Sequence, residues 1–321
     1  MISSLCSNFK LSMVVEKFAK LLFKKKNHHK CHPQPNEELP SSSLHDFHSY
    51  ISKHIDQLAL ELKPESEILS LSWFQRCFGL LPIINKVFAK LLVDIDYPMS
   101  KWNGYSVEVY LNYTMSLLEV LNSISSCLSH LGHARLSLAH GLTLVENNKS
   151  LSLARKHLKA IQPAGRFSTN FGKSFHTHDG KGNIVSGKEL IVREGVKEMK
   201  SIGFWVCGVF LSCLYGDAKP YMELRKVAGG FESSIVSTID LKIGEKLVKK
   251  MPCFSEITEI NNFVARLVAG HEVKDDATKK FQINLCEVGK IFDDISTEVD
   301  DLFDDVMTQR TKLVDGFQLR K

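Results

Sequence analysis

The sequence lacks every short motif that marks the common nucleotide-binding and hydrolytic enzymes. It contains no GxxxxGK[ST] loop, no GxGxxG turn after a strand, no HExxH helix, no GxSxG elbow and no protein-kinase signature. Each of these motifs places phosphate-binding, metal-binding or nucleophilic groups at a fixed spacing. The sequence therefore offers no candidate catalytic, cofactor-binding or metal-binding residue, and we expect a protein that is not an enzyme. The alternative is an enzyme that acts on a small apolar metabolite and uses histidines as acid and base.

Paired cysteines and bilayer-length apolar stretches are also missing. None of the eight cysteines forms a CxxC pair, and their scatter favours free, buried thiols in a reducing compartment over disulfides. The apolar run at 201–216 has 16 residues without a charge. A membrane-spanning helix needs about 20 apolar residues. We therefore predict a buried central helix at 201–216; a single short membrane span is the alternative.

Excess positive charge is confined to one end of the chain. The net charge is +5, but the first 30 residues hold seven lysines and one acidic residue, which leaves −1 for the remaining 291 residues. Nucleic-acid binding depends on a basic surface, and neither a basic stripe nor a known reader motif follows residue 30. We therefore expect no nucleic-acid partner.

The basic N-terminal segment has the pattern of a short amphipathic helix. Apolar residues recur at helical spacing from Val14 to Leu22 beside lysines. Such a helix can bind an anionic membrane surface, at about 1 kcal/mol per basic residue near it; a solvated tail is the simpler interpretation. We expect a cytoplasmic, membrane-associated protein, because a plastid transit peptide fits a segment without arginine less well. The membrane-contact candidates are Lys17, Phe18, Lys20, Leu21, Leu22, Lys24, Lys25 and Lys26.

Most of the remaining chain has helical periodicity. Apolar positions recur every three or four residues, and no stretch alternates convincingly with period two. This pattern predicts an all-α fold, an elongated multi-helix bundle with a disordered basic N-terminal segment and a long Gly-rich loop. The expected parts are a basic amphipathic segment and linker (1–42), an N-terminal helical half (43–162), the Gly-rich loop (163–187) and a C-terminal helical half (188–321). The expected helices cover about 43–63, 65–93, 106–147, 150–161, 188–215, 220–249, 256–270 and 276–317.

The last predicted helix, 276–317, is amphipathic with an acidic outer face. Its acids come every three or four residues with apolar residues between them, which does not match a calcium-binding loop. A solvated helix face is the plain interpretation. The face can alternatively receive a basic protein partner or this protein's own N-terminal segment. The partner-surface candidates are Asp300, Asp301, Asp304 and Asp305.

Histidines form three local groups. His130, His133 and His140 lie on the predicted helix 106–147 without an acidic partner at metal-binding spacing, so we expect them to be buried or half-buried and hydrogen-bonded within the bundle. The groups at 28–32 and 176–178 fall in a polar linker and in the Gly-rich loop. Neither provides the geometry of a zinc site or an activated nucleophile.

Four landmarks follow one another along the chain: Met13–Phe18, Ser70–Phe74, Asp94–Trp102 and Leu128–Arg135. Their order resembles that of the plant BYPASS-related family, which also includes the exocyst-associated ROH-type proteins. The resemblance is close from about Met13 to Pro163 and looser beyond.

This resemblance implies a regulatory protein of root and shoot development. The namesake members of the family restrain a root-derived mobile signal that arrests shoot growth, and the ROH branch implies an exocyst subunit as partner. No catalytic residue can be carried over from the family. The sequence therefore favours a non-enzymatic adaptor or regulator, with an exocyst-associated protein of exocytosis as the alternative.

Overall fold

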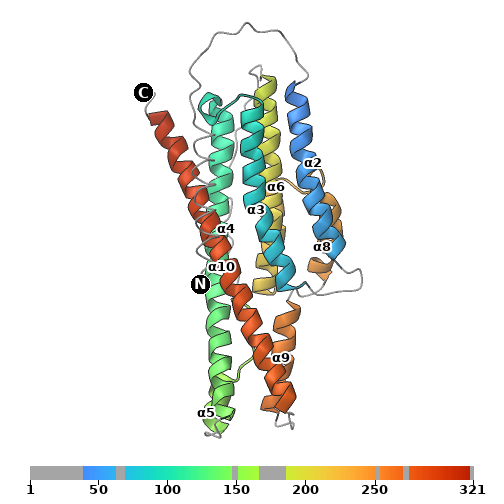
Figure 1. Cartoon of the computed structure of the whole chain (residues 1–321), viewed down its shortest axis with the longest axis vertical. Coiled ribbons are helices and arrows are strands. Elements are labelled where there is room, and N and C mark those ends of the chain that lie inside the picture. The colour runs from blue at the N-terminus through green and yellow to red at the C-terminus, as the bar shows by residue number, and fades with distance from the viewer. Residues whose placement is uncertain are drawn as a thin grey trace.

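A computed structural model describes residues 39–62, 69–146, 151–165, 186–249, 254–269 and 275–318. Within these ranges the regular structure is helical, with one isolated β-bridge between Leu69 and Phe254 (Figure 1). The all-α prediction is confirmed. The elements are α2 (Leu39–Glu61), α3 (Leu71–Asp94), the 3₁₀ turn η1 (Met99–Lys101), α4 (Gly104–Glu146), α5 (Leu151–His157), α6 (Gly187–Tyr215), α7 (Lys219–Ala228), α8 (Ser237–Lys249), α9 (Ser255–Val268) and α10 (Asp275–Gln318).

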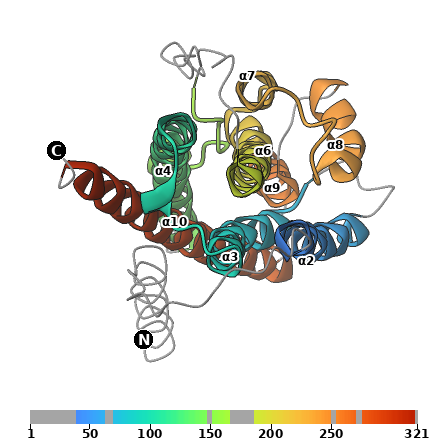
Figure 2. The same ribbon diagram turned by 90° about the horizontal axis from the view of Figure 1, so that it is seen from above.

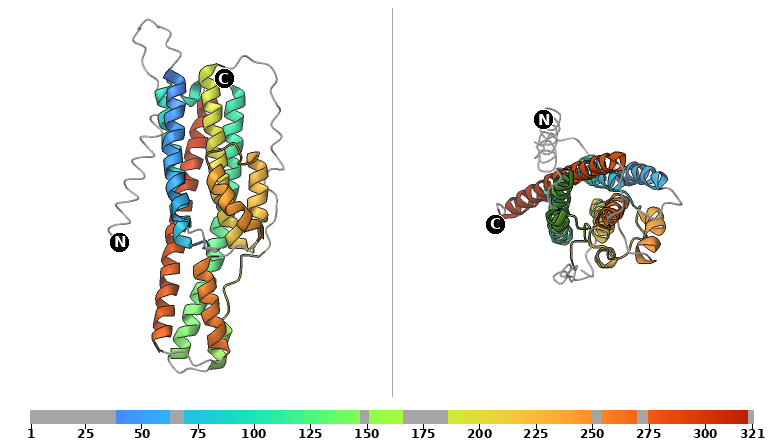
Figure 3. Two further views of the ribbon diagram at one scale, coloured as in Figure 1. Left: turned by 90° about the vertical axis from the view of Figure 1, so that its right-hand side faces the viewer. Right: turned by 90° about the horizontal axis from the view of Figure 1, so that it is seen from below.

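The helices form an elongated bundle in which α4 and α10 are the longest members. At one end, α2, α3, α4 and α6 stand side by side, and α10 crosses the outside of α3 and α4 (Figures 1 and 2). At the other end, α4 and α10 continue past the ends of α2, α3 and α6 and are joined by α5 and α9 (Figure 3). The two helical halves of the sequence share one apolar core, because α6 packs on α2, α3 and α4.

Helix α6 occupies the centre of the bundle. Every residue from Ser201 to Leu214 is buried, since α2, α3 and α4 cover one side of α6 and α7 and α8 cover the other (Figure 2). Aromatic rings fill the contacts, with Trp205 edge-on to Trp73 at 6.3 Å and Phe210 edge-on to Phe78 at 4.9 Å between ring centroids. The run at 201–216 is therefore the predicted buried central helix.

A helix that crosses a bilayer needs about 20 predominantly apolar residues in a row. None of the described helices combines the length and the apolar character that crossing a membrane demands. The alternative of a short span at 201–216 is wrong for this reason.

Two predicted helix boundaries are wrong. The stretch 220–249 is two helices, α7 and α8, because Gly229 and Gly230 adopt left-handed backbone angles (φ of 87° and 93°) that stop α7. Helix α3 begins at Leu71, not at residue 65. The side chain of Ser70 caps it by accepting a hydrogen bond from the Trp73 amide at 3.2 Å.

The predicted burial of the cysteines holds for all but one of those that the structure describes. Cys77, Cys127, Cys207 and Cys213 are buried, whereas Cys286 is exposed on α10. Burial raises the pKa of the Cys207 thiol to about 12. The Cys207 thiol therefore remains protonated and behaves as a small apolar side chain.

Candidate functional site

The acidic outer face of the last helix is confirmed and lies on α10. We call it the acidic face; Asp300 and Asp304 are exposed, whereas Asp301 and Asp305 are half-buried along the line where α10 meets its neighbours. Its members are Asp293, Asp294, Glu298, Asp300, Asp301, Asp304 and Asp305.

The half-buried carboxyls of the acidic face hold their protons more tightly than usual. Burial, followed by the charges of Asp294 and Asp301, raises the pKa of Glu298 to about 7. Burial and the charges of Asp301 and Asp304 raise the pKa of Asp305 to about 6. In the described part of the chain, no ion pair joins a carboxylate of this face to a lysine or arginine. The face therefore carries negative charge that the described bundle does not neutralise.

A groove runs beside the acidic face, where α2, α3 and α10 meet. Its cavity measures about 460 Å³. Leu58, Leu80 and Ile83 provide apolar lining, and the Arg76–Glu61 ion pair (2.8 Å) lies at the α2–α3 side. The full lining is His54, Gln57, Leu58, Glu61, Gln75, Arg76, Gly79, Leu80, Ile83 and Glu298. We call this the α2–α3–α10 groove.

Two features make this groove receptive to a ligand. The Oε2 atom of Glu298 is buried and has no hydrogen-bond partner. Gly79 is open, since a Cβ atom added there would meet no atom within 4 Å. An unpaired buried oxygen costs free energy until a donor reaches it. The missing side chain at Gly79 leaves space in the same groove for an apolar side chain of a ligand.

The open position of Gly79 gives a direct stability prediction. Gly79→Ala should raise the free energy of unfolding by about 0.5–1 kcal/mol, because alanine is the better helix former and its methyl group meets no neighbour. Urea unfolding measures the change. Gly195→Ala is the matched control: its Cβ would lie 2.7 Å from the Phe88 ring, so it should destabilise. A loss of stability in Gly79→Ala as large as that in Gly195→Ala would contradict the prediction.

A second, smaller cavity lies on the other side of α10, against α4. It measures about 250 Å³ and is lined by Gly132 and Arg135 of α4 and by Asp293 and Asp300 of α10, among others. The Nε atom of Arg135 is buried without a partner. Gly132 is as open as Gly79, which makes it a useful control position.

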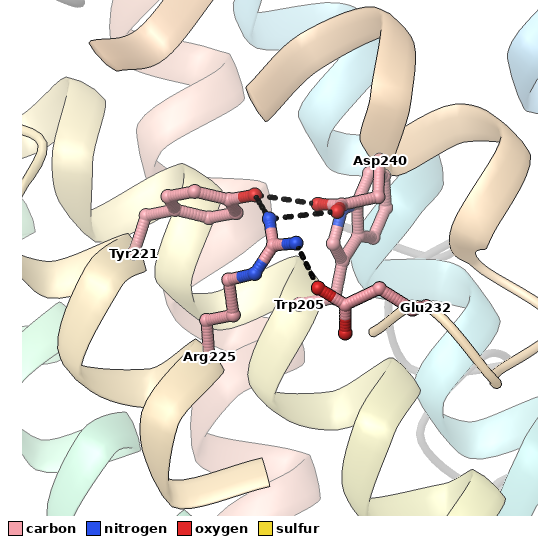
Figure 4. Close-up of polar contacts among 5 residues, drawn as sticks. All are labelled: Trp205, Tyr221, Arg225, Glu232 and Asp240. Carbon is pink, nitrogen blue, oxygen red and sulfur yellow. Dashed lines mark hydrogen bonds and ion pairs between the residues drawn. The ribbon is translucent and has the colours of Figure 1, made fainter. Parts of the chain in front are cut away.

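A buried polar cluster joins α6, α7 and α8 (Figure 4). The carboxylate of Asp240 is 4 % exposed and accepts hydrogen bonds from Trp205 Nε1 (3.0 Å), Tyr221 Oη (2.8 Å) and Arg225 Nη1 (3.1 Å). Arg225 also donates to the exposed Glu232 at 2.6 Å. These mutual hydrogen bonds connect three helices, so the cluster stabilises their packing.

The titration of this cluster is consistent with a structural role. Burial raises the pKa of Asp240, and the hydrogen bond from Tyr221 and the charge of Arg225 oppose that shift. The hydrogen bond to Glu232 raises the pKa of Arg225, so its guanidinium stays charged. Sequence reasoning did not single out any of these residues, because they come from four separate stretches of the chain.

The prediction for the histidines of α4 is wrong. His130, His133 and His140 are exposed, because they fall on the opposite side of α4 from the buried positions Leu128 and Leu131. The ring of His140 lies 4.7 Å, edge-on, from the ring of His157. No group of three or more His, Cys, Asp or Glu residues with metal-binding geometry occurs within the described ranges.

Several sequence-based candidates lie outside the described residues. They include the histidine groups at 28–32 and 176–178 and most of the Gly-rich loop. The membrane-contact candidates also lie there, namely Lys17, Phe18, Lys20, Leu21, Leu22, Lys24, Lys25 and Lys26. The interpretations of these residues remain predictions.

Comparison with known proteins identifies relatives in plants. UPF0496 protein 4 of rice (Oryza sativa subsp. japonica) is 25% identical over 221 residues, and its counterpart in subsp. indica is 26% identical over 223 residues. Protein BPS1, chloroplastic, of Arabidopsis thaliana is 30% identical over 112 residues. The chain is related to the BYPASS and UPF0496 proteins of plants. The resemblance to the BYPASS-related family is thus confirmed, at modest identity.

These BYPASS-related matches cover only parts of the proteins compared. Each rice match covers 63% of this chain and 48% of the relative, so the chain spans about half the length of the rice proteins. The BPS1 match covers 35% of this chain and 32% of BPS1. No family model matches the chain. No solved structure matches it either.

The landmarks that carry the BYPASS-related resemblance include core residues. Trp73 is buried on α3 and donates a hydrogen bond to the Leu58 carbonyl at 3.1 Å. Trp102 and Leu131 are buried as well. These residues pack the core of the bundle.

Proposed function

We propose that this protein is a non-enzymatic regulator of plant development that acts as an adaptor, with the acidic face of α10 as its surface for a basic protein partner. The observation that carries the proposal is the row of carboxylates on α10 that no described lysine or arginine neutralises. The BPS1 relative supports the developmental setting. The proposal transfers that setting to a chain that matches BPS1 over 112 residues.

The electrostatics of the acidic face suit protein recognition. Like charges on one helix repel each other, and a basic partner removes that repulsion while it forms new hydrogen bonds. Charged surfaces also speed the encounter between partners and make binding sensitive to salt. Helix α10 is 44 residues long, about 66 Å at 1.5 Å per residue, so it presents this charge on an extended rod.

Neutralising the acidic face should abolish partner binding without unfolding the bundle. The partner is first identified by proximity labelling in root tissue and is then purified. We expect the variant with Asp300, Asp301, Asp304 and Asp305 changed to Asn to lose roughly tenfold or more in affinity, which corresponds to about 1.4 kcal/mol. The fold should persist, because removal of like-charge repulsion does not destabilise.

A control variant separates the location of the charge from its amount. In this control, four exposed carboxylates outside the acidic face are changed to their amides, so the net charge changes as much as in the acidic-face variant. The four residues are Asp56, Glu108, Glu259 and Glu287. This control should bind the partner normally. The proposal is wrong if both variants bind alike, or if the acidic-face variant restores normal root and shoot growth in plants that lack the protein.

A further inference from the structure

The α2–α3–α10 groove combines an apolar floor with two carboxylates at its borders, Glu61, which pairs with Arg76, and Glu298, which has no cationic partner among the described residues. Leu58, Leu80 and Ile83 line it, and the backbone at Gly79 is left uncovered. Glu298 faces the same space with a buried oxygen that has no partner. A matching occupant therefore carries apolar side chains flanked by amino groups, which donate hydrogen bonds and neutralise the carboxyl.

Residues 13–26 of this chain have that composition. Val14, Phe18 and Leu22 recur every four residues, and Lys17 and Lys20 lie beside this apolar row. In a helix, residues four apart share a face, so the apolar row would meet the floor while lysines extend along its borders toward the walls. Long lysine stems can lie on apolar surface and place their charged ends at a carboxylate.

The connection between this segment and the groove is long enough. Twelve residues, 27–38, join Lys26 to the start of α2 at Leu39. Fully extended they span about 40 Å. The groove lies at the far half of α2, and Gln57 is about 27 Å from Leu39 along the helix at 1.5 Å per residue. The segment can therefore fold back along α2 and reach the groove within one molecule.

We propose that residues 13–26 form a helix that docks in the α2–α3–α10 groove, with Phe18 and Leu22 on its floor and lysines beside Glu61 and Glu298. This docking covers the face that the sequence assigns to a membrane surface, so the segment binds either the groove or an anionic bilayer. The proposal goes beyond the adaptor function and does not depend on it. The groove is a separate surface from the exposed carboxylates of Asp300 and Asp304.

Zero-length cross-linking of the full chain tests the docking. A carbodiimide joins a lysine amine to a carboxylate in contact with it, and mass spectrometry of the monomer locates the links. We expect links from the lysines of residues 17–26 to Glu61 and Glu298. Gly79→Phe fills the groove and should reduce their yield roughly tenfold, which corresponds to about 1.4 kcal/mol of docking free energy. Gly132→Phe fills the smaller α4–α10 cavity and should leave the yield unchanged.

A second variant leaves the groove and every lysine intact. Phe18→Ser combined with Leu22→Ser removes the apolar contacts of the segment alone, so it should lower the cross-link yield like Gly79→Phe. Vesicles that contain phosphatidylserine should also lower the yield in the unaltered chain, because they compete for the same face.

Four results would each overturn the docking proposal. The first is an unchanged yield in both Gly79→Phe and the Phe18→Ser, Leu22→Ser variant. The second is an equal loss in Gly132→Phe. The third is that the links occur only in cross-linked dimers. The groove would then bind the segment of a second copy of the chain. The fourth is that the segment binds phosphatidylserine vesicles but the cross-link yield does not fall.

Discussion

Asp240→Ala should lower the free energy of unfolding by about 3 kcal/mol. The carboxylate of Asp240 is buried and accepts hydrogen bonds from Trp205, Tyr221 and Arg225. Its removal leaves the indole and phenol donors in the core and a guanidinium without its buried partner, and each unpaired group costs free energy. The side chain of Arg225 is 31 % exposed, so water partly compensates and keeps the loss near the lower end of the range for buried pairs.

Two companion variants test whether the loss comes from the buried carboxylate. Asp240→Asn keeps Oδ1 as the acceptor for Trp205 and Tyr221, but it replaces Oδ2, the acceptor for Arg225, by an NH2 group and removes the charge. Its stability should therefore lie between that of the wild type and that of Asp240→Ala. Glu232→Ala removes the other partner of Arg225. The Glu232 side chain is 71 % exposed, so this change should cost far less stability than Asp240→Ala. Urea unfolding gives all three values. A Glu232→Ala loss as large as that of Asp240→Ala would contradict the assignment.

Gly208→Leu should destabilise the protein by about 3 kcal/mol, because α6 and α7 meet too closely at this position for a side chain. A Cβ atom at Gly208 would lie 3.2 Å from the Cα atom of Tyr221, which belongs to the backbone and cannot rotate away. The leucine side chain must push α7 outward, and Tyr221 then loses its hydrogen bond to Asp240.

Gly132→Leu is the matched control for this prediction. The position is also helical, but a Cβ atom there meets nothing within 4 Å, so the substitution should be neutral or mildly stabilising. Combining Gly208→Leu with Asp240→Ala should cost less than the sum of the single changes, because both act on the same contacts. Full additivity in a double-mutant cycle would show that the two sites are independent.

Sequence periodicity predicted most of the helices because each one buries an apolar stripe. It predicted α6 correctly, because a helix that is apolar all round is stable in a bundle only when other helices bury it. It missed the break between α7 and α8. The apolar periodicity on either side hid this break, although the pair Gly229-Gly230 is a helix stop signal that the sequence displays.

The candidate site could be predicted only in part. The acidic face lies on one helix, so its spacing alone revealed it. The α2–α3–α10 groove depends on residues as far apart as His54 and Glu298, and no local pattern records that α10 lies beside α2 and α3. The Asp240 cluster was missed for the same reason, because Trp205, Tyr221 and Asp240 lie on three different helices.

The raised pKa of Glu298 makes docking of the N-terminal segment depend on pH. In the described bundle, burial and neighbouring carboxylates raise the pKa of Glu298 to about 7. A lysine that docks beside this carboxyl lowers that pKa, so docking releases a proton. Docking therefore strengthens as the pH rises through about 7 and weakens as the pH falls. The other charged or titratable groups that face Glu298 come from α10, α2 and α3: Asp294, Asp301, His54, Glu61 and Arg76. A drop in cellular pH would thus release the segment from the bundle and free its lysines for an anionic bilayer.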